Sequence, residues 1–210
     1  MTWDALRYFN ELADTTVTNN RLPHWNQSGA SYFLTFRLAD SLPSHLLHEL
    51  NEERTAWIAK HPQPWDLKTE AEYHKIFSVK VDRWLDAGYG ECLLKQTLNA
   101  EIVSSAFHHF DADRYLLHSF VVMPNHVHVL VSTDELQTVA TLIHSWKRHT
   151  SREINKARNT IGRPLWQRDY FDRIIRNARH FIRVVRYIRS NVRQYPPAIH
   201  YESPWVRELE

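Results

Sequence analysis

The order of its expected elements places this 210-residue chain in the α+β class, as a ferredoxin-like βαββαβ antiparallel sheet with helices packed on it. Residues 31–39 are rich in aromatic and branched side chains, which is typical of a core strand. The apolar runs at residues 114–123 and 126–132 are joined only by Pro124-Asn125, which makes them antiparallel neighbours. Helical patterns follow the first and third strands, and residues 165–175 supply the fourth strand.

Start and stop signals define the helices in the first half of the chain. Residues 4–12 predict a short helix, and residues 44–61 predict a longer one that begins after a proline. The segment Thr69-Glu70-Ala71-Glu72 has the spacing of a capping box and is expected to open another helix. Asn99 is expected to cap the next helix. The stretch of about residues 44–110 is therefore interpreted as a helical insertion between the first and second strands.

The second half of the chain has similar start and stop signals for helices. A long helix is expected from Thr133 to about Lys156, and it becomes strongly basic in its second half. Asn177 is expected to cap a helix that runs through Asn191, before a C-terminal tail from about residue 195 to 210. We see no internal repeat and no linker, and we expect a single domain over residues 1–210.

Composition excludes several kinds of protein and site. Apolar residues make up 43% and charged residues 24% of the chain, as in ordinary soluble globular proteins. No apolar stretch approaches the length of a membrane span, and the N-terminal residues lack a signal-peptide pattern, so we expect a cytoplasmic protein. Cys92 is the only cysteine, which excludes an internal disulfide and a cysteine-based zinc site. With four glycines, the chain has no glycine-rich phosphate loop.

Charge is distributed unevenly along the chain. Residues 141–194 contain 14 Lys and Arg against 3 Asp and Glu, whereas the rest of the chain contains 12 against 21. Segregation of this size is typical of a surface that binds a polyanion. Solvated faces of helices would give the same count, so the charge alone does not decide between the two interpretations.

Two short patterns carry candidate chemistry. His126 and His128 are two residues apart on a predicted strand, so both imidazoles project from one face while the intervening valine projects from the other. Such a pair can bind a metal, although it also arises by chance in a chain with 14 histidines. On the helix after Asn177, the spacing of Arg183, Tyr187 and Asn191 places them in one stripe beside an apolar face. Tyr187 alone could be an amphipathic residue at the edge of the core.

Three segments of the chain together resemble a known family. They are Pro124-Asn125-His126-Val127-His128, then Trp166-Gln167-Arg168-Asp169-Tyr170-Phe171-Asp172-Arg173, then Tyr187-Ile188-Arg189-Ser190-Asn191. In this order they resemble the single-tyrosine HUH transposases that are associated with repetitive extragenic palindromes (REP), an insertion-sequence class. The resemblance covers roughly residues 30–195. Members often have Asn-Pro at the end of the tyrosine helix, where this chain has Asn191-Val192.

The resemblance implies a specific activity and a specific set of site residues. His126, His128 and Asn191 would hold a divalent metal, Mg²⁺ or Mn²⁺, although the ligand types alone would also admit Zn²⁺. Tyr187 would be the nucleophile that cuts and rejoins single-stranded DNA next to a palindromic hairpin, through a covalent 5′-phosphotyrosine intermediate. The expected partner is therefore single-stranded DNA with a REP-like hairpin, and the sequence leaves monomer and homodimer open.

Other residues are candidates for contacts with DNA. The basic candidates for phosphate binding are Lys147, Arg148, Arg152, Arg168, Arg173 and Arg183. The aromatic candidates for stacking on unpaired bases are Trp146, Trp166, Tyr170 and Phe171, which could equally be core residues. We interpret Asp172 as the partner of an arginine and not as a catalytic group.

Two other functions remain open at this point. The chain could be a noncatalytic DNA-hairpin binding protein derived from such a transposase. It could also be a metal-dependent hydrolase that activates water, which would normally need a carboxylate near the histidine pair, and none follows His128 before Asp134.

Overall fold

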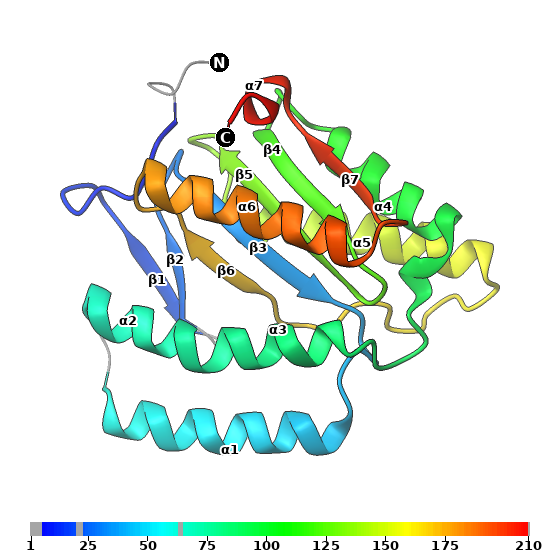
Figure 1. Cartoon of the computed structure of the whole chain (residues 1–210), viewed down its shortest axis with the longest axis horizontal. Coiled ribbons are helices and arrows are strands. Elements are labelled where there is room, and N and C mark those ends of the chain that lie inside the picture. The colour runs from blue at the N-terminus through cyan, green and yellow to red at the C-terminus, as the bar shows by residue number, and fades with distance from the viewer. Residues whose placement is uncertain (1–5, 20–22, 63–64, 210) are drawn as a thin grey trace.

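The computed structural model describes residues 6–19, 23–62 and 65–209, and a five-stranded antiparallel sheet lies at its centre (Figure 1). The strands lie in the order β6-β3-β5-β4-β7. Their bounds are β3 Ser31–Arg37, β4 Tyr115–Val122, β5 His126–Thr133, β6 Phe171–Ile174 and β7 Ile199–Glu202. The first four in chain order form a βαββαβ unit, in which the first strand lies between the third and the fourth. The expected ferredoxin-like fold is confirmed.

Helices cover both faces of the sheet. On one face, Leu34 and Val129 pack with α4 (Thr97–His108) and α5 (Val139–Ala157). On the other face, Phe33 and Leu130 pack under α6 (Ala178–Gln194), which crosses in front of the sheet in Figure 1. Every residue of β5 is buried as a result, and the side chains at alternate positions belong to different cores. Val127, Val129 and Val131 face α4 and α5, so His126 and His128 face α6, as the alternation predicted.

The helical insertion forms a separate layer beside the sheet. It consists of α1 (Ser44–Lys60), α2 (Leu67–Tyr73), a π-helical turn η2 (His74–Ser78) and α3 (Val79–Asp86). In Figure 1, α2 and α3 run end to end between α1 and the sheet. The layer has a small core of its own, made by Leu50, Trp65, Tyr73 and Phe77. The predicted insertion of about residues 44–110 was too long, because α4 belongs to the βαββαβ unit and packs on the sheet.

Two predicted helix caps were wrong. The backbone N–H of Thr69 donates to the Asp66 carboxylate at 2.7 Å, so the helix begins earlier and the proposed capping box lies inside it. Asn99 is buried in the first turn of α4, after the N-cap residue Gln96, and its amide donates to the Leu93 carbonyl at 2.9 Å. In both cases the helix begins at a polar residue that lies three positions before the predicted cap.

Three other segments also differ from the expectation. Described residues 6–12 contain no helix, and the rest of that predicted helix lies outside the described residues. A hairpin of β1 (Thr16–Asn19) and β2 (Pro23–Asn26) stands where a polar connection was expected. The strand β6 is shorter than residues 165–175 because only its second half pairs with β3, although Trp166 forms an isolated bridge to Leu38.

The start of the long basic helix and the C-terminal residues also differ from the prediction. β5 continues to Thr133, so α5 begins only after a turn, where Thr138 and Thr141 form a capping box. The residues after 195 are not a tail without structure, since β7 pairs with β4 and a short helix α7 (Pro204–Arg207) follows it. No helix within the described ranges combines the length and the apolar character that a membrane span requires.

Candidate active site

The two histidines converge beneath α6. Their Nε2 atoms are 3.1 Å apart, and both side chains are buried. Burial lowers the pKa of His126 to about 3, and burial together with the neighbouring His126 lowers the pKa of His128 well below its ordinary value. Both imidazoles are therefore neutral at pH 7, which is the state that can donate a nitrogen lone pair to a metal.

The outer nitrogen of each imidazole is held by a neighbouring side chain. His128 Nδ1 lies 2.7 Å from Thr35 Oγ1 on the adjacent strand. His126 Nδ1 lies 2.8 Å from the amide oxygen of Asn125, whose amide nitrogen donates to the carbonyls of Leu85 and Tyr89 at the end of the insertion. The two bonds to the carbonyls of Leu85 and Tyr89 identify the nitrogen end of the Asn125 amide, so its oxygen end faces His126. Because that oxygen can only accept, His126 Nδ1 must carry the proton. The Nε2 of His126 is then free to act as a ligand, and Asn125 is the residue that orients it.

Tyr187 faces this pair from the middle of α6. Its hydroxyl lies 3.3 Å from His128 Nε2, and the Phe33 ring packs against both side chains. The side chains of Asn191 and Asp82 also interact electrostatically with Tyr187. Burial raises the pKa of Tyr187 above its ordinary value, and the nearby Asp82 carboxylate raises it further. In this environment the phenol keeps its proton until another group removes it.

Asn191 lies one turn after Tyr187 and is buried on the same stripe of α6. Its amide nitrogen donates to the Tyr187 carbonyl at 2.9 Å, which leaves the amide oxygen as the atom that a metal would bind. The structure thus brings His126, His128, Tyr187 and Asn191 to one place, from a strand and a helix far apart in the sequence. Within the described residues, no three His, Cys, Asp or Glu side chains come together as a metal site. A metal would therefore be held by the histidine pair completed by an amide.

Asp82 is a site residue that the sequence did not reveal. It lies on α3, and its carboxylate interacts electrostatically with the Tyr187 side chain. Burial raises the pKa of Asp82 to about 7; the interaction with Tyr187 opposes that rise, and the charge of Asp86 adds to it. Asp82 lies 44 residues before His126, whereas a carboxylate for the histidine pair was sought only among the residues that follow His128. The only signal was an acid next to the apolar stripe of Phe77, Val81 and Leu85.

The basic candidates for DNA binding fall into two groups. Arg148, Arg152, Arg168 and Arg183 have exposed side chains, although Arg152 pairs with the neighbouring Glu153 at 2.8 Å. Arg173 is half-buried. Lys147 donates to the backbone carbonyls of residues 167–169 at 2.9 to 3.2 Å, so its ammonium holds the loop before β6.

Most of the aromatic candidates are packed inside the protein. Trp146 and Trp166 are buried, and the Trp166 indole donates to Thr150 Oγ1 at 2.8 Å. Tyr170 stacks on His24 with ring centroids 4.4 Å apart. His24 in turn contacts Asp172 at 2.6 Å between Nδ1 and Oδ1, and both side chains are buried. Asp172 thus pairs with a histidine, whereas we expected an arginine.

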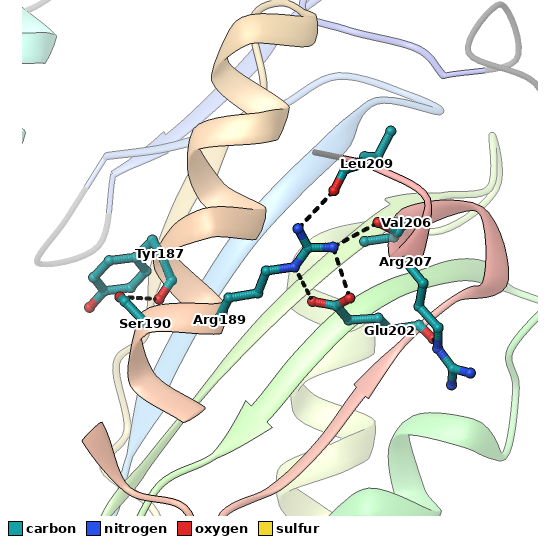
Figure 2. Close-up of polar contacts among 7 residues, drawn as sticks. All are labelled: Tyr187, Arg189, Ser190, Glu202, Val206, Arg207 and Leu209. Atoms are coloured by element: carbon teal, nitrogen blue, oxygen red, sulfur yellow. Dashed lines mark hydrogen bonds and ion pairs between the residues drawn. The ribbon is translucent and has the colours of Figure 1, made fainter. Parts of the chain in front are cut away.

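The C-terminal residues hold α6 from the side away from the nucleophile. Figure 2 shows Arg189 and Tyr187 on opposite flanks of the helix. The Arg189 guanidinium forms two bonds with the Glu202 carboxylate, at 2.8 and 3.0 Å, and donates to the carbonyls of Val206 and Leu209. A bidentate pair with further bonds to backbone fixes a helix more firmly than a single surface ion pair. The predicted tail therefore stabilises the helix that carries Tyr187.

A neutral histidine pair on a buried strand, opposite a helix that carries a tyrosine and an amide, defines a tyrosine-and-histidine site on a ferredoxin-like fold. The family model described as "Transposase IS200 like" matches residues 68–191, and the chain belongs to this family of transposases. The match covers more than half of the chain and includes all five site residues.

Two solved structures are similar to this chain at low identity. One is a REP-associated tyrosine transposase bound to a REP hairpin, at 14% identity and a TM-score of 0.46, over 82% of this chain and 72% of that one. The other is a protein from Deinococcus radiodurans R1 assigned as a transposase, at 11% identity and a TM-score of 0.31, over 83% of this chain and 97% of that one. No curated protein matches the chain. Identities this low carry no information about individual residues.

Proposed function

We propose that this transposase is a metal-dependent single-stranded DNA endonuclease that cuts and rejoins DNA beside palindromic hairpins through a covalent 5′-phosphotyrosine at Tyr187. The observation that carries the proposal is the Tyr187 hydroxyl, 3.3 Å from Nε2 of His128 at the converging histidine pair. Family membership supports a transposase-type function. The position of the tyrosine supports the covalent route, because a nucleophile must lie beside the group that binds the reacting phosphate.

The donor set fits a divalent metal. His126 and His128 would supply neutral nitrogens with their outer nitrogens already engaged, and Asn191 would supply an amide oxygen. When bound, Mg²⁺ or Mn²⁺ would polarise the phosphate oxygens and stabilise the negative charge that develops on them.

The chain's own groups account for the proton and the nucleophile. The phenol proton of Tyr187 passes to the Asp82 carboxylate, the acid whose charge acts on the phenol. The phenol oxygen then attacks phosphorus, the bond from phosphorus to the 3′ oxygen breaks, and that oxygen leaves as a 3′-hydroxyl after taking a proton from solvent. Since the new phosphotyrosine ester retains the phosphate, attack by a 3′-hydroxyl reverses the step and rejoins the strand.

A water-activating hydrolase is a second candidate because Asp82 supplies the carboxylate that the sequence appeared to lack. In this structure, however, the carboxylate interacts with Tyr187. A hydrolase would cut DNA without a protein adduct, and a noncatalytic binding protein would not cut it, so detection of the adduct distinguishes all three functions.

We expect the protein to prefer single-stranded DNA with a hairpin over blunt duplex. Arg148, Arg152, Arg168 and Arg183 are exposed for phosphate contacts, whereas a half-buried nucleophile beneath the surface favours a strand that leaves the duplex. If all four arginines neutralise phosphates on a single strand, affinity should fall with salt with a logarithmic slope of about −3. Fluorescence anisotropy with hairpin and duplex probes over a salt series measures both effects, and equal affinity for the two probes would contradict the expectation.

Asp82→Asn is expected to slow adduct formation by about a hundredfold, the usual contribution of a general base, with hairpin affinity unchanged. The pKa of Asp82 is about 7, so the carboxylate is protonated below that pH and the native rate should rise as the pH passes through about 7. The variant should lose this rise. Asp86→Asn, one turn further along the same helix, is the matched control; it should keep the rise but move it to lower pH, because the Asp86 charge raises the pKa of Asp82. Single-turnover rates over a pH series are the measurement, and an identical profile in Asp82→Asn would remove the assigned role.

A further inference from the structure

A cavity of about 120 Å³ lies between the helical insertion and the sheet. Its walls are largely apolar and aromatic, and they include Phe36, Leu47, Leu50, Tyr73, Phe77 and Phe171. Thr35 and Asp82 also line it. Because Thr35 contacts His128 and Asp82 contacts Tyr187, the cavity adjoins the candidate active site.

Two polar groups at this cavity are buried without a partner. Tyr73 is only 2% exposed, and its hydroxyl has no hydrogen-bond partner among the described residues. Within the same ranges, the Nε atom of Arg54 is buried and equally unpaired. Burial raises the pKa of Tyr73 to about 12, so its hydroxyl remains protonated and can both donate and accept. Buried polar groups are nearly always satisfied in native proteins, which indicates that a ligand completes these two.

The cavity is lined by charged groups of both signs beside its unpaired donors. Arg37 and Arg54 line the cavity, together with the acids Asp82 and Asp169. Burial lowers the pKa of Arg37 to about 10, although Asp169 opposes that effect, so the guanidinium still carries its charge at pH 7. An aromatic wall with donor groups at its edge is the arrangement by which proteins stack and read an unpaired base.

We propose that this cavity binds one unpaired pyrimidine base of the DNA strand that Tyr187 cuts. An engineered protein cavity of about 150 Å³ holds benzene, so a cavity of about 120 Å³ is closer in size to one six-membered ring than to a two-ring purine. The ring packs against the apolar walls, and its carbonyl groups accept hydrogen bonds from Tyr73 and Arg54. This inference rests on the proposed function for the identity of the strand, and it adds a base preference near the cleaved bond.

The first experiment measures binding without cleavage. In a Tyr187→Phe background, hairpin-containing single strands are titrated by fluorescence anisotropy, with each base near the cleavage site replaced in turn by an abasic site. Stacking of a base on aromatic side chains predicts a loss of about tenfold at a single position. A purine at that position should give a similar loss, and the other pyrimidine a smaller one. A uniform scan, or a position that prefers a purine, would overturn the proposal.

Two variants connect that position to the cavity. Leu47→Trp fills the cavity and should remove the sensitivity to the abasic site, whereas Leu46→Trp places the same side chain on the same helix outside the cavity and should keep it. Tyr73→Phe keeps the ring and removes only the unpaired hydroxyl, so it should reduce the base preference even if Leu47→Trp does not fold. An unchanged scan in Tyr73→Phe and in a folded Leu47→Trp would contradict the proposal.

Adduct formation by the protein with native Tyr187, measured in parallel, separates the two claims. An adduct together with a uniform scan overturns the base pocket alone. A position-specific scan without any adduct supports the pocket and overturns the proposed chemistry.

Discussion

Tyr187→Phe is expected to abolish the covalent adduct with DNA while hairpin affinity changes by less than about threefold, or roughly 0.7 kcal/mol. The substitution keeps the ring that packs edge-on against Phe33 and removes only the oxygen that faces His128 and Asp82. Among the described residues, the side chains that interact with this oxygen are imidazole, amide and carboxylate, so none of its direct partners can replace it as a hydroxyl nucleophile. Denaturing electrophoresis of the protein with labelled single strands gives the adduct yield, and anisotropy gives the affinity.

Tyr170→Phe is the matched control for that experiment. Tyr170 belongs to another segment that resembles the family, and its ring stacks on His24 at a centroid distance of 4.4 Å. Its hydroxyl has no contact with the histidine pair, so the adduct should persist in this variant. Loss of the adduct in Tyr170→Phe with retention in Tyr187→Phe would reverse the assignment.

His126→Ala and His128→Ala are each expected to reduce metal-dependent cleavage by at least about a hundredfold, the usual cost of losing one group that stabilises transition-state charge. Cleavage by the native protein should stop with a chelator and return with Mg²⁺ or Mn²⁺. The fold should survive because Val127 and Val129 pack on the opposite face of the sheet, in the larger core. Cleavage assays after chelation and metal addition make the measurement, and full activity of either variant in chelator would contradict the metal site.

His118→Ala separates loss of the metal site from loss of a buried side chain. His118 is fully buried on the neighbouring strand β4, where its Nε2 lies 2.7 Å from Ser132 Oγ, away from Tyr187. This variant should be destabilised to a similar extent as the other two and still cleave DNA. Thermal unfolding of all three variants shows whether they lose a similar amount of stability.

The sequence was informative wherever a regular backbone sets the geometry. A period of two placed His126 and His128 on one face of β5, and a helical period placed Tyr187 and Asn191 one turn apart, so the four residues that the structure brings together were candidates before it was seen. The antiparallel hairpin of β4 and β5 followed from its two-residue connection. These are short-range consequences of backbone geometry.

Contacts between distant segments could not be predicted in this way. Asp82 reaches Tyr187 only because the insertion docks beside the sheet, and no local pattern encodes that docking. The strand β7 was missed for the same reason, since its pairing with β4 joins segments some eighty residues apart. Tryptophans in a basic segment were ambiguous because burial in the core and stacking on DNA require the same side chains, and Trp146 and Trp166 proved to be buried.

The measurement that tests the central claim most directly is the identification of the residue that is linked to DNA. A single strand carrying the hairpin and a 3′ label is incubated with protein and Mg²⁺ or Mn²⁺, the products are separated by denaturing electrophoresis, and the adduct peptide is mapped by mass spectrometry. The 3′ label should travel with the protein, because the fragment attached through its 5′ phosphate keeps that end, and the modified residue should be Tyr187. Cleavage without an adduct, or an adduct at another residue, would contradict the account.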